Sequence, residues 1–440
     1  METTTFEQLY PPETWQEQTK KVVEMLRAGK SVQVIAPPGV GKSNLLRLLA
    51  YNGKVREKHL GKDAGRFHFV YMDFSEVRER SLFEIIKFIL ISLSYSLGER
   101  KFDEEQAVVN ENLKEALEFA DELIFFQSLK KSVDYLAKVR NLYLVFMFDR
   151  FDDYIPNIDS RFFLDLRILN SRVAYNLVSV FGVTRPVEDS LETSIFDEFH
   201  ELLVGNHVFL PVKDPPGLAF RFSYLDQVTG KNPDERAKKE IEKLTGGHGK
   251  LARLSYEAIL SEDLPVQAEK IDDIEKLLLS RSQIKAALVE LWEFLTAEEQ
   301  IDLKGGSKND FLEKTGLQSN GKITIPLLKT FLISLPKEAT SAKLVYDPER
   351  NEIRKGDEDI TDKLTPSEFR LLRYLMQNAS RVCEKDEIIN QVWRDSKSQE
   401  GVTDQALDQI VYRLRKKIEN DPDSPHLIQT VKGRGYKFSG

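Results

Sequence analysis

Five short apolar segments recur along the first half of the chain, and stretches of helical character separate them. The apolar segments are rich in β-branched and aromatic residues, which favours β-strands. The stretches between them repeat apolar residues every three to four positions, which predicts amphipathic helices. The predicted strands lie at 31–36, 67–74, 142–148, 177–183 and 207–210, and the predicted helices near 81–97, 112–139 and 160–175. This alternation predicts an α/β fold, in which a parallel sheet carries helices on both faces.

The pattern changes after position 210, where the strand signal fades. Residues 211–280 have helical spacing with two breaks, which predicts a helical lid. Residues 281–341 contain a helix, a break at Gly305 and Gly306, and two further short helical segments, which predicts a small winged-helix-like unit. The breaks in the lid lie at 229–233 and 246–249. The first helix of the winged-helix-like unit lies at 284–295.

The segment APPGVGKS at 36–43 follows the first predicted strand and opens a helix. It fits the P-loop pattern GxxxxGK[ST] except that Ala36 replaces the first glycine. In this setting backbone N–H groups and the positive helix end converge on a phosphate, whereas the alternative is a Pro/Gly turn with a chance GKS. The strand and helix on either side favour the P-loop. The predicted nucleotide-binding residues are Pro38, Gly39, Val40, Gly41, Lys42, Ser43 and Asn44.

A P-loop implies a magnesium site and a partner carboxylate. Lys42 is expected to reach the β- and γ-phosphates of ATP, and Ser43 to ligate Mg²⁺. Asp149 ends the third predicted strand, where a second ligand of the ion is expected. Asp152 or Asp153 could orient an attacking water, or both could belong to a solvated acidic turn. No glutamate follows Asp149 directly, so we expect slow ATP hydrolysis.

Two further residues are candidates for contact with the nucleotide. Arg185 follows the fourth predicted strand at the carboxyl edge of the sheet, where a cation can meet the γ-phosphate. The alternative for Arg185 is an ordinary surface arginine. His248 lies in the GGHGK segment of the lid and is expected to approach the nucleotide, with a purely structural histidine as its alternative.

Four of these motifs together resemble the STAND branch of the AAA-type P-loop ATPases. They are APPGVGKS, the strand end DRFDD, the TR pair after the next strand, and the lid segment GGHG. The resemblance covers about residues 6–260. It implies a nucleotide switch that is closed with ADP and opens to form a homo-oligomer with ATP.

The last hundred residues have a different pattern of polar and apolar positions. Polar and apolar positions alternate over 343–360, then helices are predicted at 364–379, 385–393 and 404–419, and a hairpin after them. Thr365, Pro366 and Glu368 form a helix-start signal. The third helix places Leu407, Val411, Leu414 and Ile418 on one face, which predicts its core side. The opposite face carries Gln405, Gln409, Tyr412, Arg413 and Lys416.

Glutamine and arginine can read base edges in a major groove, and lysine can meet a phosphate. Lys432 and Arg434 at the hairpin tip could enter the adjacent minor groove. The alternatives are a solvated basic helix with an ordinary hairpin, and a winged helix that binds only protein.

This region closely resembles the OmpR/PhoB-type winged-helix DNA-binding domain. The matching segments are LTPSEFRLLRYL, the pair Val392–Trp393, VTDQALDQIVYRLRKKI and IQTVKGRGYKF. The resemblance implies that the recognition helix and the wing contact double-stranded DNA. The implied contact residues are Gln409, Arg413, Arg415 and Lys416 on the helix, and Thr430, Lys432, Arg434 and Tyr436 on the wing. No receiver domain is recognised, so aspartate phosphorylation is not expected as the input.

Composition narrows the class of protein. Of 440 residues, 41% are hydrophobic and 30% charged, which is ordinary for a globular protein. The 63 basic and 71 acidic residues give a net charge of −8, which argues against coating nucleic acid through overall charge. The single cysteine, Cys383, excludes an intrachain disulfide and favours a reducing compartment, so we expect a cytoplasmic protein. Neither a signal peptide nor a membrane span is predicted.

Together these features predict four domains and a DNA-binding nucleotide switch. The domains are a P-loop domain at 1–210, a helical lid at 211–280, a winged-helix-like unit at 281–341 and a winged-helix DNA-binding domain at 342–440. We expect a transcription regulator whose ATP or ADP state controls assembly and DNA binding, with contact to RNA polymerase. One alternative is a DNA-stimulated ATPase machine, of the loader, transposition or defence type, docked by its winged helix. The other is a C-terminal module that autoinhibits or binds protein.

Overall fold

The protein was analysed as a computed structural model. It describes residues 6–119, 121–261, 271–334, 344–348, 350–355, 358–379, 381–393, 403–419, 425, 427–431 and 434–439. The chain divides into two compact units, one ending at Leu332 and one beginning at Ile333. Within the described residues, no helix has the length and apolar character needed to cross a bilayer.

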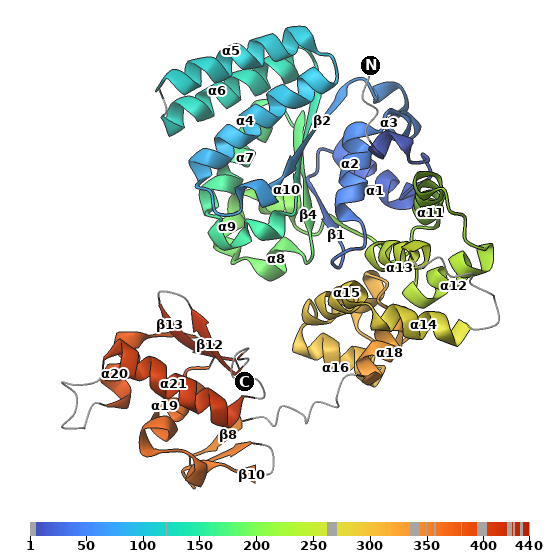
Figure 1. The fold of residues 1–440 in the computed structure, drawn as a ribbon. Coiled ribbons are helices and arrows are strands. Elements are labelled where there is room, and N and C mark those ends of the chain that lie inside the picture. Colours follow the sequence, from blue (N-terminus) through green and yellow to red (C-terminus); the bar gives the residue numbers. More distant parts are fainter. Residues whose placement is uncertain are drawn as a thin grey trace. The chain divides into compact units, whose positions relative to one another are not determined.

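A five-stranded sheet organises the first unit (Figure 1). Its strands are β1 (Val32–Ile35), β2 (Phe67–Asp73), β3 (Tyr143–Asp149), β4 (Leu177–Val183) and β5 (His207–Phe209). They lie in the order β2-β3-β4-β1-β5, and all neighbours are parallel. Every residue of β3 and β4 is buried, as expected for inner strands of a parallel sheet. The predicted α/β fold is confirmed.

Helices cover both faces of this sheet, as Figure 1 shows. One face packs against α1 (Gln16–Arg27) and α2 (Lys42–Tyr51), and the other against α4 (Leu82–Glu99), α6 (Glu122–Asp134) and α7 (Ser160–Arg172). Alternate residues of each strand therefore enter two different cores. Shorter helices complete this domain: α3 (Gly53–Leu60), α8 (Val187–Ser190), α9 (Thr193–Phe196) and α10 (His200–Leu203).

The helix predicted at 112–139 is wrong as a single element. The structure has two helices there, α5 (Asp103–Phe119) and α6, and a π-helical turn (Tyr135–Val139) follows α6. The Asp121 carboxylate accepts the N–H of Ile124 at 3.1 Å and so caps a new helix. The helix predicted to reach 175 ends at Arg172, because positive φ angles at Ala174 and Tyr175 interrupt it.

Helices also fill the rest of the first unit. The lid region contains α11 (Pro215–Thr229), α12 (Glu235–Thr245), α13 (Gly249–Ser261) and α14 (Ile271–Ser280). The following small unit contains α15 (Ser282–Glu293), α16 (Ala297–Gly305), α17 (Asp310–Lys314), a hairpin of β6 (Gln318–Ser319) and β7 (Lys322–Ile323), and α18 (Pro326–Ser334). The predicted break at Gly305 and Gly306 is the end of α16, where Gly306 takes a left-handed conformation.

The second unit joins a small sheet to three helices and a second sheet. The first sheet contains β8 (Leu344–Asp347), β9 (Glu352–Lys355) and β10 (Glu358–Asp359). The remaining elements are α19 (Pro366–Gln377), β11 (Val382–Glu384), α20 (Lys385–Val392), α21 (Asp404–Ile418), β12 (Ile428–Val431) and β13 (Gly435–Phe438). Strands β11, β13 and β12 form an antiparallel sheet, and Thr365 and Glu368 form the expected capping box. This is a winged helix with its own core.

Candidate functional site

The predicted P-loop connects β1 to α2 as expected. Gly39 and Gly41 have φ angles of 76° and 135°, which L-residues with a side chain rarely adopt. Among the described residues, no side chain caps the N-terminus of α2. The N–H groups of its first turn are therefore available to an anion, and the helix dipole favours negative charge there.

Ala36, the residue that departs from the P-loop pattern, fits its position without strain. It is fully buried and is not among the residues with a positive φ. Its carbonyl oxygen accepts a hydrogen bond from the Lys42 ammonium at 2.8 Å. A glycine is therefore not required at this position, and the Lys42 side chain is folded back over the loop.

Two carboxylates contribute to the electrostatic environment of Lys42. Burial lowers the pKa of Lys42 from its ordinary value, and the negative charges of Asp152 and Asp149 oppose that shift. Burial also raises the pKa of Asp152, which the positive charge of Lys42 opposes. The P-loop lysine is thus electrostatically coupled to two carboxylates that lie 107 and 110 positions further along the chain.

Asp149 ends β3 and is fully buried. Its carboxylate accepts the Tyr71 hydroxyl at 2.6 Å and the Arg150 N–H at 3.0 Å. Mg²⁺ in proteins commonly takes one or two carboxylates and completes its shell with phosphate oxygens and water. A carboxylate at Asp149 and a hydroxyl at Ser43 suit that chemistry, and their role as Mg²⁺ ligands stays a prediction.

Asp152 and Asp153 point to different partners. The Asp152 carboxylate accepts both the N–H and the hydroxyl of Thr184, at 2.9–3.0 Å. Asp153 forms an ion pair with Arg78 at 3.0 Å. Both carboxylates are thus hydrogen-bonded to the protein in this conformation, and their role in orienting an attacking water stays a prediction.

The structure places Arg185 against the small unit at 282–334. Its guanidinium makes two hydrogen bonds to the Glu299 carboxylate, at 2.9 and 2.6 Å, and one to the Phe294 carbonyl oxygen at 3.1 Å. It also lies over the rings of Phe294 and Phe311, 4.7 and 4.6 Å from their centroids. A contact between Arg185 and a γ-phosphate therefore requires that this ion pair break.

His248 contacts the P-loop itself. Its Nε2 donates to the Pro38 carbonyl oxygen at 2.9 Å, while its Nδ1 accepts the N–H of Leu251 at 3.2 Å. Burial lowers the pKa of His248 to about 4, so the ring is neutral near pH 7. The neighbouring Lys250 N–H donates to the Gly39 carbonyl at 2.9 Å. The lid thus holds the backbone of the loop at two adjacent residues.

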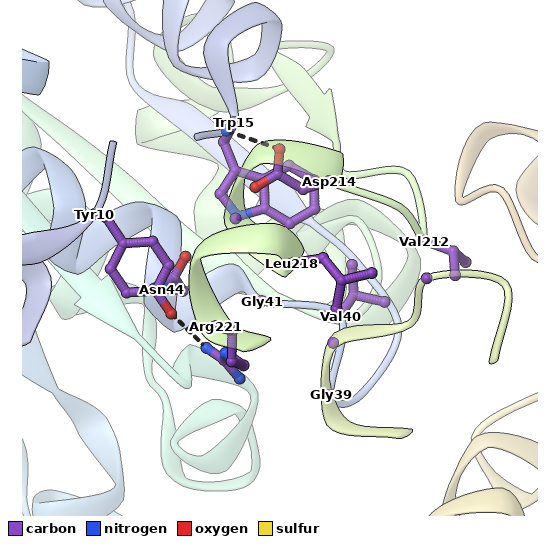
Figure 2. A pocket seen from close by; sticks show the side chains of 13 residues that line it. Tyr10, Trp15, Gly39, Val40, Gly41, Asn44, Val212, Asp214, Leu218 and Arg221 are labelled. Carbon is purple, nitrogen blue, oxygen red and sulfur yellow. Dashed lines mark hydrogen bonds between the residues drawn. The ribbon is translucent and has the colours of Figure 1, made fainter. Parts of the chain in front are cut away.

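A pocket beside the P-loop gathers residues that the sequence analysis missed (Figure 2). Its cavity volume is about 60 Å³. Arg221 donates to the Tyr10 hydroxyl at 2.7 Å, and the Trp15 N–H donates to Asp214 at 3.2 Å. Burial raises the pKa of Asp214 to about 6. Val40, Gly41 and Asn44 of the loop and Leu218 of α11 complete this wall.

The sequence held a signal for this pocket in two places. The run YPPETW before α1 supplies Tyr10 and Trp15, and the run KDPPG after β5 supplies Asp214. Both runs combine prolines with a large or charged residue next to an element end. Their distance from the P-loop along the chain concealed that they converge on it.

In the second unit, α21 presents the expected polar face. Leu407, Ile410, Val411, Leu414 and Ile418 are buried in the core. The predicted contact residues Gln405, Gln409, Tyr412, Arg413 and Lys416 are all exposed, as are Asp404, Asp408 and Lys417. The Lys416 ammonium lies 4.5 Å from the centroid of the Tyr412 ring. The five predicted contact side chains are accessible to a large ligand such as a DNA groove.

Hydrogen bonds within the domain hold three other predicted DNA-contact residues, namely Arg415, Thr430 and Tyr436. Arg415 donates to the Ile428 carbonyl oxygen at 2.7 Å and to the Thr430 hydroxyl at 2.8 Å, so it joins α21 to β12. The Tyr436 hydroxyl donates to Asp408 at 2.6 Å, and Tyr436 is 4% exposed. Arg434 is exposed at the hairpin, whereas Lys432 lies outside the described residues.

Comparison with known proteins identifies the kind of domain at the C-terminus. Residues 361–438 match the family model "Transcriptional regulatory protein, C terminal". Protein PetR of Rhodobacter capsulatus is 38% identical over 106 residues, which cover 24% of this chain and 44% of PetR. The phosphate regulon transcriptional regulatory protein PhoB of Escherichia coli K12 is 33% identical over 96 residues, which cover 22% of this chain and 39% of PhoB. The chain thus spans less than half the length of these curated relatives.

Among solved structures, the Walker-type ATPase of Pyrococcus abyssi aligns with 72% of this chain and 95% of its own, at 16% identity and a TM-score of 0.42. The P-loop assignment rests on the parallel sheet and on the loop between β1 and α2. Residues 361–438 therefore form a winged-helix domain similar to the C-terminal domains of OmpR- and PhoB-type regulators, and they follow a P-loop ATPase-like domain in the same chain.

Proposed function

We propose that this protein is a nucleotide-responsive regulator of transcription. In this proposal it binds ATP or ADP with Mg²⁺ at the P-loop and double-stranded DNA at α21, and the nucleotide state sets assembly and DNA affinity. The observation that carries the proposal is the union, in one chain, of an uncapped α2 N-terminus beside Lys42 and a winged helix with an exposed polar face on α21.

The nucleotide part of the proposal rests on three features of one edge of the sheet. The first turn of α2 offers N–H groups to phosphates, and Ser43 and Asp149 offer oxygen ligands to Mg²⁺. The adjoining pocket is lined by Tyr10 and Trp15, which are 2% and 4% exposed, so a nucleobase would reach their rings only after a rearrangement. When bound, Mg²⁺ would neutralise phosphate charge, while Lys42 would swing from Ala36 to the phosphates.

The DNA part of the proposal rests on α21 and on its relatives. The family model that matches residues 361–438 describes the C-terminal part of transcriptional regulatory proteins, and PhoB is named one of these proteins. Gln409 and Arg413 are of the residue types that read base edges, and Lys416 of the type that meets phosphates. Contact with RNA polymerase and formation of a homo-oligomer with ATP belong to the same proposal.

We infer slow hydrolysis from the positions of two side chains. Thr184 holds Asp152, and Glu299 holds Arg185, so neither acts on a γ-phosphate without rearrangement. A protein that hydrolyses slowly remains in its ATP state long enough to act as a switch. A switch also requires that its nucleotide states differ in affinity for DNA or for a second copy.

The test measures retention of duplexes from a randomised pool with ATP, with ADP and without nucleotide, and sizes the complexes. We expect one sequence motif, whose retention and half-site spacing depend on the nucleotide. Lys42→Ala should abolish nucleotide binding and this dependence, whereas Lys54→Ala, which removes an exposed lysine of α3, should change neither. Lys42→Ala without any effect on motif, affinity or stoichiometry would refute the coupling.

The same experiment separates the alternative function. Sequence-independent retention, together with ATP hydrolysis that rises strongly with added duplex, would identify a DNA-stimulated ATPase machine. A hydrolysis rate that stays flat with duplex would exclude it.

A further inference from the structure

A second cavity lies at the open edge of the sheet, away from the P-loop pocket. It has a volume of about 740 Å³, within the range of small-molecule sites. Strand β2 pairs with β3 on one side only, and in Figure 1 it lies between α4 and α2. The cavity wraps around this edge, and α2, α3, β2 and α4 contribute its walls. No predicted nucleotide or DNA contact uses it.

Two arginines line this cavity without an acidic partner. Arg56 donates to the Leu49 and Ala50 carbonyl oxygens at 3.1 and 2.6 Å, and Arg100 donates to the Phe67 carbonyl at 2.5 Å. Among the described residues, neither guanidinium forms an ion pair with a carboxylate. Burial lowers the pKa of both, and the charge of Arg56 lowers that of Arg100 further, to about 10. Two partly buried cations that repel each other favour a bound anion.

A guanidinium has five N–H donors, so the carbonyl contacts leave donors on both arginines. Among the described residues, Arg56 donates only through its Nη1 group, whereas Arg100 also donates through Nη2 to the Ala64 carbonyl oxygen at 3.5 Å. The remaining N–H groups can bind an oxyanion in a forked geometry.

The rest of the wall is aromatic near the arginines and acidic at the far end. Tyr51, Tyr71 and Tyr95 line the cavity, and Tyr95 is 71% exposed. Asp73 and Glu76 lie at the other end of β2, roughly 13 Å from Phe69 at about 3.3 Å per residue. Glu99 lines the arginine end, since it precedes Arg100 in the chain, and burial raises the pKa of its carboxyl. A ligand with several anionic groups would also meet Asp73 and Glu76, whereas one with a single anionic end at the arginines would not.

We propose that this cavity binds a small organic anion with an aromatic body, whose single carboxylate or phosphate is held by Arg56 and Arg100 and whose ring packs among Tyr51, Tyr71 and Tyr95. The residues of this cavity, rather than a repeat domain, would then receive the input signal. This binding does not depend on the proposed function.

Tyr71 links the cavity to the P-loop site. Its ring lines the cavity, and its hydroxyl donates to Asp149 at 2.6 Å. A ligand that moves this ring also moves a hydrogen bond to the predicted Mg²⁺ ligand. Tyr71 is thus a positioning residue, and this coupling, unlike the binding, rests on the proposed nucleotide function.

The binding test uses calorimetric titration of the full-length Lys42→Ala variant, so that the P-loop does not bind the phosphate probe. The probes are 2-naphthoate, 1-naphthyl phosphate and uncharged 2-naphthol. We expect either anion to bind about tenfold or more tightly than 2-naphthol, as charged hydrogen bonds predict. The tighter of the two anions identifies the oxyanion that the site prefers.

Added substitutions locate the bound probe. Arg100→Gln should weaken the anions about tenfold, and Ser92→Trp, which fills the cavity, should abolish binding. Arg66→Gln, which removes an exposed arginine outside the cavity, should have no effect. Tyr95→Ala changes an exposed ring and should weaken binding even if Arg100→Gln does not fold. Equal affinity for 2-naphthol, no saturable binding at millimolar probe, or indifference to both Ser92→Trp and Tyr95→Ala would overturn the proposal.

The coupling has a separate readout, the affinity for ADP with Mg²⁺ of the protein with intact Lys42. The anion should shift this affinity, and Tyr71→Phe should remove the shift while leaving probe binding intact. A shift that Tyr71→Phe leaves unchanged would overturn the role of Tyr71. Failure of ADP to bind at all would refute the proposed function, whereas the probe titrations would still decide the cavity.

Discussion

At the scale of single residues, Arg185 joins two parts of the first unit. It follows β4 directly, yet its guanidinium binds Glu299 and lies over Phe294 and Phe311. The side chains of Arg185 and Glu299 are 21% and 8% exposed, so the pair is mostly removed from water. The Arg185 pair also lowers the pKa of the Glu299 carboxyl against the effect of burial.

Removing one partner of this pair is therefore expected to be costly. Arg185→Gln leaves Glu299 buried without its counter-ion and should lower the free energy of unfolding by about 3 kcal/mol. Chemical denaturation of the full chain measures this loss. The control is Arg253→Gln, which breaks an exposed pair with Glu257 and should cost less than about 0.5 kcal/mol. Equal losses in both variants would show that the Arg185 pair adds nothing beyond a surface contact.

His248 predicts a pH dependence of stability. Its folded pKa of about 4 lies below the unfolded value of 6.5, so the unfolded chain binds more protons between these values. The stabilising contribution is complete above pH 6.5 and is lost as the pH falls toward 4. Relative to His248→Gln, the protein should lose about 2–3 kcal/mol of unfolding free energy between pH 7 and 4.5.

Denaturation curves of both proteins across this range measure the effect. The comparison removes the contribution of Asp214, whose raised pKa of about 6 changes stability in the opposite direction. Parallel pH profiles would show that His248 is not buried as a neutral ring.

At the scale of the element, α21 carries two adjacent lysines with different roles. Lys416 is exposed on the polar face, whereas Lys417 binds Glu368 at 2.5 Å and the Lys363 carbonyl at 2.9 Å. Lys416→Gln should weaken binding to all duplexes and lower the salt slope of binding by about 1. Lys417→Gln should instead lower the melting temperature and leave the salt slope unchanged. Binding titrations at several salt concentrations measure both slopes, and equal slopes would place Lys416 outside the interface.

Elements were predictable from sequence where burial dictates composition. All five strands appeared as apolar runs because helices cover both faces of this parallel sheet. Helix α3 was not predicted, because GKVREKHL has few apolar residues and its ends are held by Asn52 and by tertiary contacts. The break between α5 and α6 was hidden because neither glycine nor proline marks it.

Some residues of the candidate site could likewise be predicted from the sequence, whereas their distant contacts could not. Lys42, Ser43 and Asp149 were predictable because their roles follow from a contiguous loop and a strand end. Partners such as Glu299 for Arg185, and the pairing of Tyr10 with Arg221, depend on contacts more than 100 positions apart, which no local pattern encodes.

At the scale of the whole molecule, the two units have separate cores. The apolar core of the second unit contains only residues from 344 to 438, and the two large cores of the sheet domain contain none of them. We therefore expect two unfolding transitions in scanning calorimetry. ADP with Mg²⁺ at a hundred times its Kd should stabilise only the first unit, by about 2.7 kcal/mol, and a specific duplex only the second. A single transition that both ligands shift together would contradict this independence.

The backbone at Ala36 has a consequence for mutational tolerance. Position 36, the first glycine position of the P-loop pattern, takes an ordinary conformation here, whereas Gly41, the second glycine position, and Gly39 between them have positive φ angles. A methyl group at Gly39 would lie 2.7 Å from the Lys250 Cβ, so that position is sterically closed as well. A side chain at position 36 is consequently tolerated by the backbone, and a motif search that demands glycine there would pass over this loop.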